Sequence, residues 1–127
     1  MSVTAGSGFA ERFGWPDLLA RPLAIGHRGA SAHVRENTLA SFARASDLGA
    51  EMWELDVQMT RDGVPVVSHD DHLLRVFGMD ARISTLNAAD LASIAGIEVP
   101  TFAEVAALAR ERSAGLYVEL KAAGAGP

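Results

Sequence analysis

The segment Met52–Met59 constrains the fold of this 127-residue chain more than any other, because its side chains divide into two chemically different sets. Successive side chains of a β-strand point to opposite faces of a sheet. One face of the predicted strand carries Met52, Glu54, Asp56 and Gln58, and the other carries Trp53, Leu55, Val57 and Met59. The pattern therefore predicts a strand whose acids all lie on a single side.

Two further segments are predicted to be strands. Leu23–Gly26 and Leu116–Leu120 are short runs of mainly apolar residues, typical of buried strands. Asp62-Gly63 is a tight-turn pair, and the extended piece Val64–Val67 follows it, which predicts a small hairpin after the acidic strand.

Helices are predicted between these strands. Asn37-Thr38 supplies N-cap chemistry for one helix, and Thr101 with Glu104 forms a capping-box pattern for a second helix that ends at Gly115. Two shorter helices are predicted at Trp15–Ala20, where a loosely ordered leader is the alternative, and at Ala88–Ile94. Alternating strands and helices imply right-handed βαβ units and a parallel sheet covered by helices, which is the α/β class.

Composition and charge exclude several classes of function. The chain is 49% hydrophobic with a net charge of -5, a balance typical of a single globular domain. It has no basic block, so nucleic acid is not an expected partner. No apolar run approaches about 20 residues and no secretory signal is visible, so we expect a cytoplasmic protein without stable membrane insertion. The absence of cysteine excludes disulfides and thiolate chemistry.

Three carboxylates are candidates for a metal site. Glu54 and Asp56 are separated by roughly 6 to 7 Å of strand backbone, and like charges this close resist desolvation unless a cation lies between them. Glu119 lies in another predicted strand, close to the same edge of the sheet. Oxygen ligands favour Mg²⁺ or Ca²⁺ over structural zinc. The alternatives are that the strand acids are simply solvated, and that Glu119 forms a weak surface ion pair with Lys121.

Two histidines come near the ends of predicted strands, at the edge where α/β sheets and barrels bind ligands. His27 follows the first strand and His69 follows the hairpin. Two imidazoles in different environments can serve as acid and base near neutral pH, although a lone histidine is more often structural. Arg28 could clamp a phosphate or could be a surface arginine. His33 and His72 have no such placement and are treated as background.

Taken in order, these motifs resemble the glycerophosphodiester phosphodiesterase family. The resemblance rests on His27-Arg28-Gly29, Glu36-Asn37-Thr38, Glu54-Leu55-Asp56-Val57, Thr60-Arg61-Asp62-Gly63, Val66-Val67-Ser68-His69-Asp70 and Glu119-Leu120-Lys121. It runs from about Leu23 to Lys121. Each tripeptide is a weak signal by itself, but the set in this order and at these intervals is specific.

The resemblance implies a TIM-type (β/α)₈ barrel and a phosphoric diester hydrolase that acts on a small glycerophosphodiester, releasing glycerol 3-phosphate and an alcohol. In the family the glycerol 2-hydroxyl is thought to attack the phosphorus, giving a cyclic phosphate that water opens. The implied roles are a divalent cation, Mg²⁺ or Ca²⁺, held by Glu54, Asp56 and Glu119, an acid/base pair of His27 and His69, and phosphate contacts from Arg28 and Lys121.

The resemblance also implies that the barrel is incomplete. A full barrel needs about 250 residues, whereas this chain reaches only the third barrel strand. We expect residues 1–21 to form an N-terminal extension and residues 22–127 a partial domain, the N-terminal portion of the barrel. A three-stranded sheet would leave one parallel edge unpaired. Two alternatives remain, a non-catalytic fragment that binds metal or phosphate, and a phospholipase D-like enzyme acting on lysophospholipids.

Overall fold

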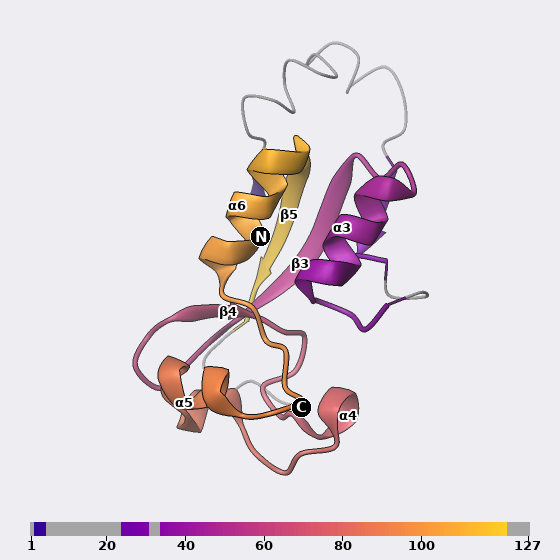
Figure 1. The fold of residues 1–127 in the computed structure, drawn as a ribbon. Helices are drawn as coiled ribbons and strands as arrows, with labels where there is room; N and C mark the ends of the chain where they lie inside the picture. Colours follow the sequence, from indigo (N-terminus) through magenta and orange to yellow (C-terminus); the bar gives the residue numbers. More distant parts are fainter. Residues whose placement is uncertain (1, 5–23, 31–33, 122–127) are drawn as a thin grey trace.

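The computed structural model describes residues 2–4, 24–30 and 34–121 (Figure 1). Its elements are β1 (Ser2–Thr4), β2 (Ile25–His27), α3 (Leu39–Asp47), β3 (Met52–Met59), β4 (Pro65–Val67), α4 (Leu74–Phe77), the 3₁₀ helix η1 (Ile83–Thr85), α5 (Ala88–Ser93), α6 (Phe102–Arg112) and β5 (Gly115–Leu120). The helix predicted at Trp15–Ala20 lies outside the described residues. None of the described helices is long and apolar enough to cross a membrane.

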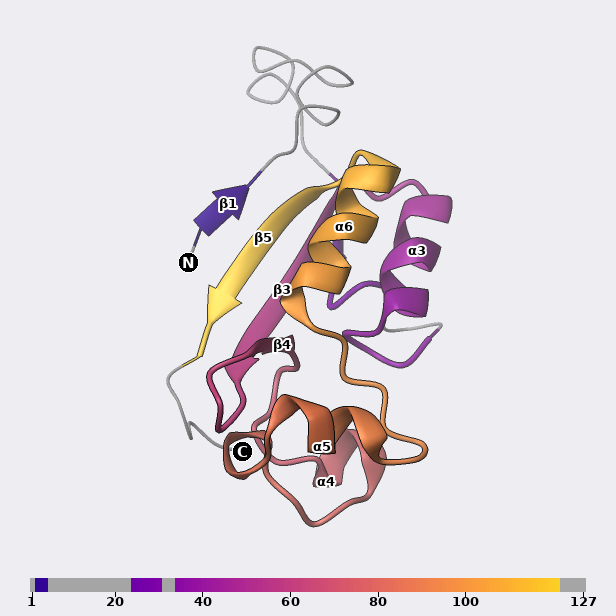
Figure 2. The same ribbon diagram turned by 60° about the vertical axis from the view of Figure 1, so that its left-hand side comes forward.

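A sheet in the order β1-β5-β3-β2 organises the fold. β3 lies between β2 and β5 and is parallel to both, with Trp53 beside Gly26 on one side and Leu116 on the other. β4 returns antiparallel to the end of β3, which confirms the predicted hairpin. Figures 1 and 2 show α3 and α6 side by side over one face of this sheet, as expected for βαβ units.

The outer edge of β5 is paired, whereas β2 has no strand on its outer side among the described residues, so one parallel edge stays open as expected. β1 runs antiparallel beside β5, with Ser2 opposite Val118 and Thr4 opposite Leu116 (Figure 2). This pairing gives hydrogen-bond partners to backbone groups that a free strand edge presents unpaired. The partner strand is far away in the sequence, and three residues carry too little pattern to predict it.

The helix-covered face of β3 forms the main core. Trp53, Leu55 and Val57 are buried together with residues of α3, α6 and β5. Phe42 of α3 stacks on Trp53 with ring centroids 5.2 Å apart, and the indole N–H of Trp53 donates a 3.0 Å hydrogen bond to Ser46 Oγ. The apolar set of the predicted alternation therefore faces the helices, which places the acids on the opposite face.

The segment between β4 and α6 forms a separate lower lobe, residues 68–100, beyond the C-terminal end of β3 (Figures 1 and 2). It has its own small core of Leu73, Ile83 and Leu91, completed by Val66 of β4. The helix predicted at Ala88–Ile94 is confirmed as α5, whereas α4 and η1 were not predicted. The lobe thus lies over the sheet edge at which ligands of α/β proteins bind.

The two long helices begin where the sequence predicts. The Thr38 hydroxyl accepts a hydrogen bond from the first turn of α3, and Thr101 and Glu104 form the predicted capping box of α6. The predicted end of α6 at Gly115 was wrong. Ser113 ends the helix with φ 54, its backbone N–H bonded to carbonyls of the last turn, and Gly115 is already the first residue of β5.

Candidate functional site

Three carboxylates meet on the face of the sheet opposite the helices. Glu54 and Asp56 project from β3 and Glu119 from β5, and the strand register places Asp56 beside Glu119. Each carboxyl group has an oxygen within 4.8 Å of an oxygen of the other two. Asp56 is only 1% exposed, whereas the Glu119 side chain is 46% exposed. The alternative of merely solvated strand acids is therefore wrong for Asp56, and the group opens towards solvent at Glu119.

Burial disfavours the charged forms of the two acids on β3. It raises the pKa of Glu54, and the neighbouring Asp56 carboxylate raises it further. Burial also raises the pKa of Asp56, although a 3.4 Å hydrogen bond from Asn37 opposes the shift. Asp56 Oδ1 is buried without a hydrogen-bond partner among the described residues. Such an atom costs about 1 to 3 kcal/mol, and a cation between the carboxylates would relieve both this cost and the repulsion. The donor set therefore fits a metal ion.

Lys121 belongs to the same group. Its ammonium nitrogen lies 3.1 Å from Glu119 Oε1 and 4.0 Å from Asp56 Oδ1. The hydrogen bond and charge of Lys121 lower the pKa of Glu119. The Glu119–Lys121 ion pair that the sequence offered as an alternative does form. Glu119 nevertheless remains within 4.8 Å of Glu54 and Asp56, so the ion pair does not remove it from the three carboxylates.

Arg28 reaches the carboxylates from the loop after β2. Its backbone adopts φ 53, so that its N–H donates to the main-chain oxygen of Glu54 at 2.8 Å and to Glu54 Oε2 at 3.2 Å. Its guanidinium lies 3.3 Å from Glu36 and 3.6 Å from Asp56. Gly29 follows with φ 80, and a Cβ at this position would collide with α3. The left-handed backbone of Arg28, a non-glycine residue, costs of order 1 to 3 kcal/mol. Strain of this kind clusters at functional sites.

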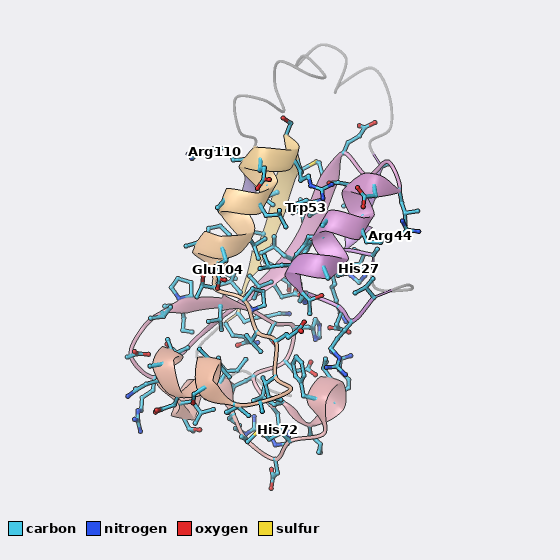
Figure 3. All side chains as sticks on the ribbon, in the orientation of Figure 1. His27, Arg44, Trp53, His72, Glu104 and Arg110 are labelled. Carbon is cyan, nitrogen blue, oxygen red and sulfur yellow. The ribbon has the colours of Figure 1, made fainter. Side chains whose placement is uncertain are left out.

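His27 lies at the end of β2, beside the carboxylates. Its Nε2 is 3.4 Å from Glu54 Oε2, and its ring is largely exposed. Figure 3 shows His27 close to the lower part of α3, whereas His72 lies at the opposite end of the lower lobe. His72 bonds Asp80 at 2.8 Å in that lobe. His33 lies outside the described residues.

His69 lies in the loop that follows β4, and this loop is fastened to β3. The Ser68 N–H donates to the main-chain oxygen of Asp56 at 2.9 Å, and the Gln58 amide donates to the main-chain oxygen of His69 at 2.9 Å. The His69 charge lowers the pKa of Asp56, so this ring lies within electrostatic range of the carboxylates. Its Nδ1 is 2.7 Å from Asp70 Oδ1.

Three residues that connect these groups were not singled out from the sequence. Arg75 of α4 donates to both oxygens of Glu36 at 2.9 Å each and to Asp70 Oδ2 at 2.7 Å. Glu36 and Asp70 lie in two of the motifs that resemble the family, and nothing else in the sequence indicated a role for them. Glu36 and Arg75 are 39 residues apart, so no local pattern could have joined them.

Comparisons with known proteins show which family the chain resembles. The model of the glycerophosphoryl diester phosphodiesterase family matches residues 27–123. A glycerophosphodiester phosphodiesterase of Caldanaerobacter subterraneus subsp. tengcongensis is 38% identical over 111 residues, which cover 80% of this chain and 46% of that protein. A human lysophospholipase D is 43% identical over 67 residues, covering 53% of this chain and 21% of that protein.

A solved structure shows the same fold. A phosphodiesterase of Oleispira antarctica, solved in complex with its product sn-glycerol-3-phosphate, superimposes with a TM-score of 0.74 and 34% identity, covering 79% of this chain and 44% of that one. This chain thus spans less than half the length of these relatives. Its parallel strands β2, β3 and β5 with α3 and α6 are the N-terminal portion of a TIM-type (β/α)₈ barrel, which is incomplete in this chain. The family model covers the carboxylates, both candidate histidines, Arg28 and Lys121, and the chain belongs to the glycerophosphoryl diester phosphodiesterase family.

Proposed function

We propose that this chain carries the catalytic residues of a metal-dependent hydrolase that splits glycerophosphodiesters into glycerol 3-phosphate and an alcohol. The observation that carries the proposal is the group of three carboxylates within 4.8 Å of one another, on the sheet face opposite the helices in a fold shared with this family. The Oleispira antarctica relative was solved with sn-glycerol-3-phosphate as product, which supports a substrate that contains a glycerol phosphate.

Glu54, Asp56 and Glu119 are the proposed metal ligands. All three donate oxygen, and hard oxygen donors favour Mg²⁺ or Ca²⁺. A divalent cation bound there would polarise a phosphoryl oxygen and neutralise part of its negative charge. The orphaned oxygen of Asp56 supports this assignment, because a buried carboxylate oxygen otherwise needs a donor.

Arg28 and Lys121 are the proposed phosphate contacts. In a protein with a net charge of -5, positive charge for a phosphate must be supplied locally. The Arg28 guanidinium makes only long contacts, 3.3 Å to Glu36 and 3.6 Å to Asp56, and its Nε has no hydrogen-bond partner among the described residues. Donors of Arg28 therefore remain for a phosphate oxygen.

His27 and His69 are the proposed acid/base pair. One imidazole takes the proton of the substrate's glycerol 2-hydroxyl as its oxygen attacks the phosphorus. The bond from phosphorus to the alcohol oxygen breaks, and the other imidazole protonates that oxygen. Water then opens the cyclic phosphate with the roles reversed, so that both histidines return to their starting protonation states. The net reaction is diester and water to monoester and alcohol.

The test is turnover of glycerophosphocholine by the full chain with Mg²⁺ or Ca²⁺, followed by the release of glycerol 3-phosphate. We expect release to stop on chelation, to return when the cation is added back, and to be abolished in His27→Ala. His72→Ala is the matched control, because His72 pairs with Asp80 in the lower lobe. Activity that survives both chelation and His27→Ala would refute the proposed mechanism.

The human lysophospholipase D relative supports a second substrate class for the same site. Release of choline from lysophosphatidylcholine, with no turnover of glycerophosphocholine, would select that class. Cation binding measured by calorimetry, with neither substrate turned over, would instead select a non-catalytic metal-binding role. The cytoplasmic location and the absence of a nucleic-acid partner stay predictions.

A further inference from the structure

Arg75 bonds carboxylates from two loops of the site at once. Its Nη1 and Nη2 each lie 2.9 Å from an oxygen of Glu36, in the loop before α3, and its Nε lies 2.7 Å from Asp70, in the loop after β4. A bidentate contact between a guanidinium and a carboxylate fixes the orientation of the two groups as well as their distance. The short helix that carries Arg75 is anchored by the buried Leu73 just before it. The lower lobe therefore holds this guanidinium against the site.

Asp70 links Arg75 to His69. Each of its carboxylate oxygens has a different partner, Oδ2 accepting from Arg75 Nε at 2.7 Å and Oδ1 lying 2.7 Å from His69 Nδ1. The Asp70 side chain is almost fully buried. Burial by itself raises the pKa of Asp70, but the hydrogen bonds from Arg75 and His69 outweigh it and lower this pKa. Asp70 is therefore an ionised acceptor at neutral pH.

An ionised acceptor at Nδ1 determines which nitrogen of a neutral imidazole carries the proton. The proton resides on Nδ1, where the carboxylate accepts it, and Nε2 is left as the basic nitrogen. Without Arg75, Asp70 would lose its second partner, and its carboxylate could turn away from the ring or take up a proton. Either change removes the preference for the Nδ1–H form.

We propose that Arg75 is a positioning residue that holds Asp70 so that His69 keeps its proton on Nδ1 and presents Nε2 to the substrate. The catalytic consequence rests on the proposed function, because His69 is a member of the proposed acid/base pair. The positioning itself is a property of His69, Asp70 and Arg75 in the folded chain and can be measured without substrate.

The experiment compares Arg75→Met with Arg82→Met in the full chain. Arg82 is a matched control, because it lies in the same lobe, its side chain is 47% exposed against 50% for Arg75, and it pairs at 3.6 Å with Asp71, outside the proposed site. The readout is the ¹⁵N NMR spectrum of the histidine rings at about pH 8, where an unperturbed imidazole is neutral. Asp70→Asn marks the signals of His69.

We expect the Nδ1–H form of His69 to dominate in the parent chain and in Arg82→Met, and to give way to a mixture of both tautomers in Arg75→Met. If Arg75→Met does not fold, judged by circular dichroism, Arg75→Lys replaces it, because a single ammonium cannot make all three contacts. A parent chain with the proton on Nε2, or a His69 spectrum unchanged by removal of the guanidinium, would overturn the proposal.

Turnover adds a second readout. We expect kcat with glycerophosphocholine to fall roughly 10- to 100-fold in Arg75→Met with little change in KM, as for partners that orient a functional histidine, and to be unchanged in Arg82→Met. A merely structural bridge would lower stability without selectively lowering kcat or altering the tautomer, and that result also overturns the proposal. A parent chain without turnover would contradict the proposed function alone, and the NMR comparison would still decide the role of Arg75.

Discussion

The two faces of β3 bury side chains to a similar degree but with opposite consequences for stability. On the helix-covered face, Trp53 and Leu55 are fully buried among apolar partners, and this burial stabilises the fold by about 25 cal/mol per Å². On the opposite face, Asp56 is just as inaccessible, yet it lies beside Glu54 and has an oxygen without a hydrogen-bond partner among the described residues. One face holds the fold together, whereas the other opposes folding, a cost that a bound cation would relieve.

The alternation of the strand makes this separation possible. Neighbouring residues belong to different faces, so substitutions one position apart should change different properties. Removing a large side chain from the helix-covered face should lower stability. Removing a charge from the carboxylate face should raise the stability of the metal-free chain and remove the site. The predictions below test this contrast in order of expected size, each beside its control variant.

The largest effect is expected for Trp53→Ala. Its truncation removes the stack on Phe42 and the hydrogen bond to Ser46 and leaves a cavity, so the free energy of unfolding should fall by about 3 to 5 kcal/mol. Urea unfolding followed by circular dichroism measures the change. Trp53→Phe is the matched control, because it keeps a ring beside Phe42 and should lose less. A loss below about 1 kcal/mol in the alanine variant would remove the basis for treating this face as the main core.

Asp56→Asn should act in the opposite direction. In the presence of a chelator, the free energy of unfolding should rise by about 1 to 3 kcal/mol, because a buried charge next to Glu54 is lost. Affinity for Mg²⁺ or Ca²⁺, measured by calorimetry, should fall by more than about 100-fold, since losing a ligand should exceed the 10- to 100-fold effect of losing a partner that only orients one.

Asp71→Asn is the matched control for this variant. Asp71 is as buried as Asp56, but its two oxygens accept hydrogen bonds from Ser84 N at 2.8 Å and Ser84 Oγ at 2.7 Å. Its replacement should therefore lower stability and leave cation binding unchanged. If Asp56→Asn destabilised the metal-free chain as much as Asp71→Asn, the contrast between the two faces of β3 would fail.

The pH dependence of the Asp56→Asn effect sharpens the same comparison. Burial raises the folded-state pKa values of Asp56 and Glu54 above 3.8 and 4.5. The folded chain then binds protons at these groups more tightly than the unfolded chain, so stability falls as pH rises through this window. The stability gain of Asp56→Asn should therefore be small below pH about 4 and should grow as pH rises towards neutrality.

Other carboxylates of the site have the opposite dependence but do not affect this difference. Hydrogen bonds from Arg75 lower the pKa of Glu36, and those from Arg75 and His69 lower that of Asp70 despite its burial. Their stabilisation is present above the unfolded values and is lost as pH falls through the folded ones. The parent chain and Asp56→Asn both contain Glu36 and Asp70, so the contribution of these groups cancels in the difference between the two proteins. Unfolding of parent and variant with chelator, from pH about 3 to 8, measures the difference, and a gain that grew towards acid pH would contradict the assignment of Asp56.

Local pattern was sufficient to predict the parts of the fold that repeat over a few residues. The alternation over Met52–Met59 predicted the bounds of β3 and the face of each side chain, and the capping-box pattern at Thr101 predicted the start of α6. The three carboxylates could be grouped because parallel strands end at the same edge of a sheet, so Glu119 was expected at the edge that carries Glu54 and Asp56. The register then places Glu119 beside Asp56.

Features that depend on contacts between distant segments could not be predicted in this way. The pairing of β1 with β5 joins residues far apart in the sequence, and Ser2–Thr4 is too short to show a pattern. The Arg75 contacts depend on a four-residue helix whose position is set by the lower-lobe core. The end of α6 was misplaced because Ser113, a non-glycine residue, adopts the left-handed conformation that ends the helix before Gly115.

The smallest effect is expected at the start of α6, which covers the apolar face of β3. Figure 3 shows Glu104 in the first turn of this helix, where its carboxylate accepts from the Thr101 N–H at 3.0 Å while the Thr101 hydroxyl accepts from the Glu104 N–H at 3.1 Å. Thr101→Ala should lower the free energy of unfolding by about 1 kcal/mol, and Thr101→Ser, which keeps the hydroxyl, should restore most of it. Cation affinity should not change in either variant, because the helix contacts the face of β3 that carries no ligands. A cation affinity that fell with the loss of this cap would show that the two faces are coupled through β3, and the separation of stability from metal binding would not hold.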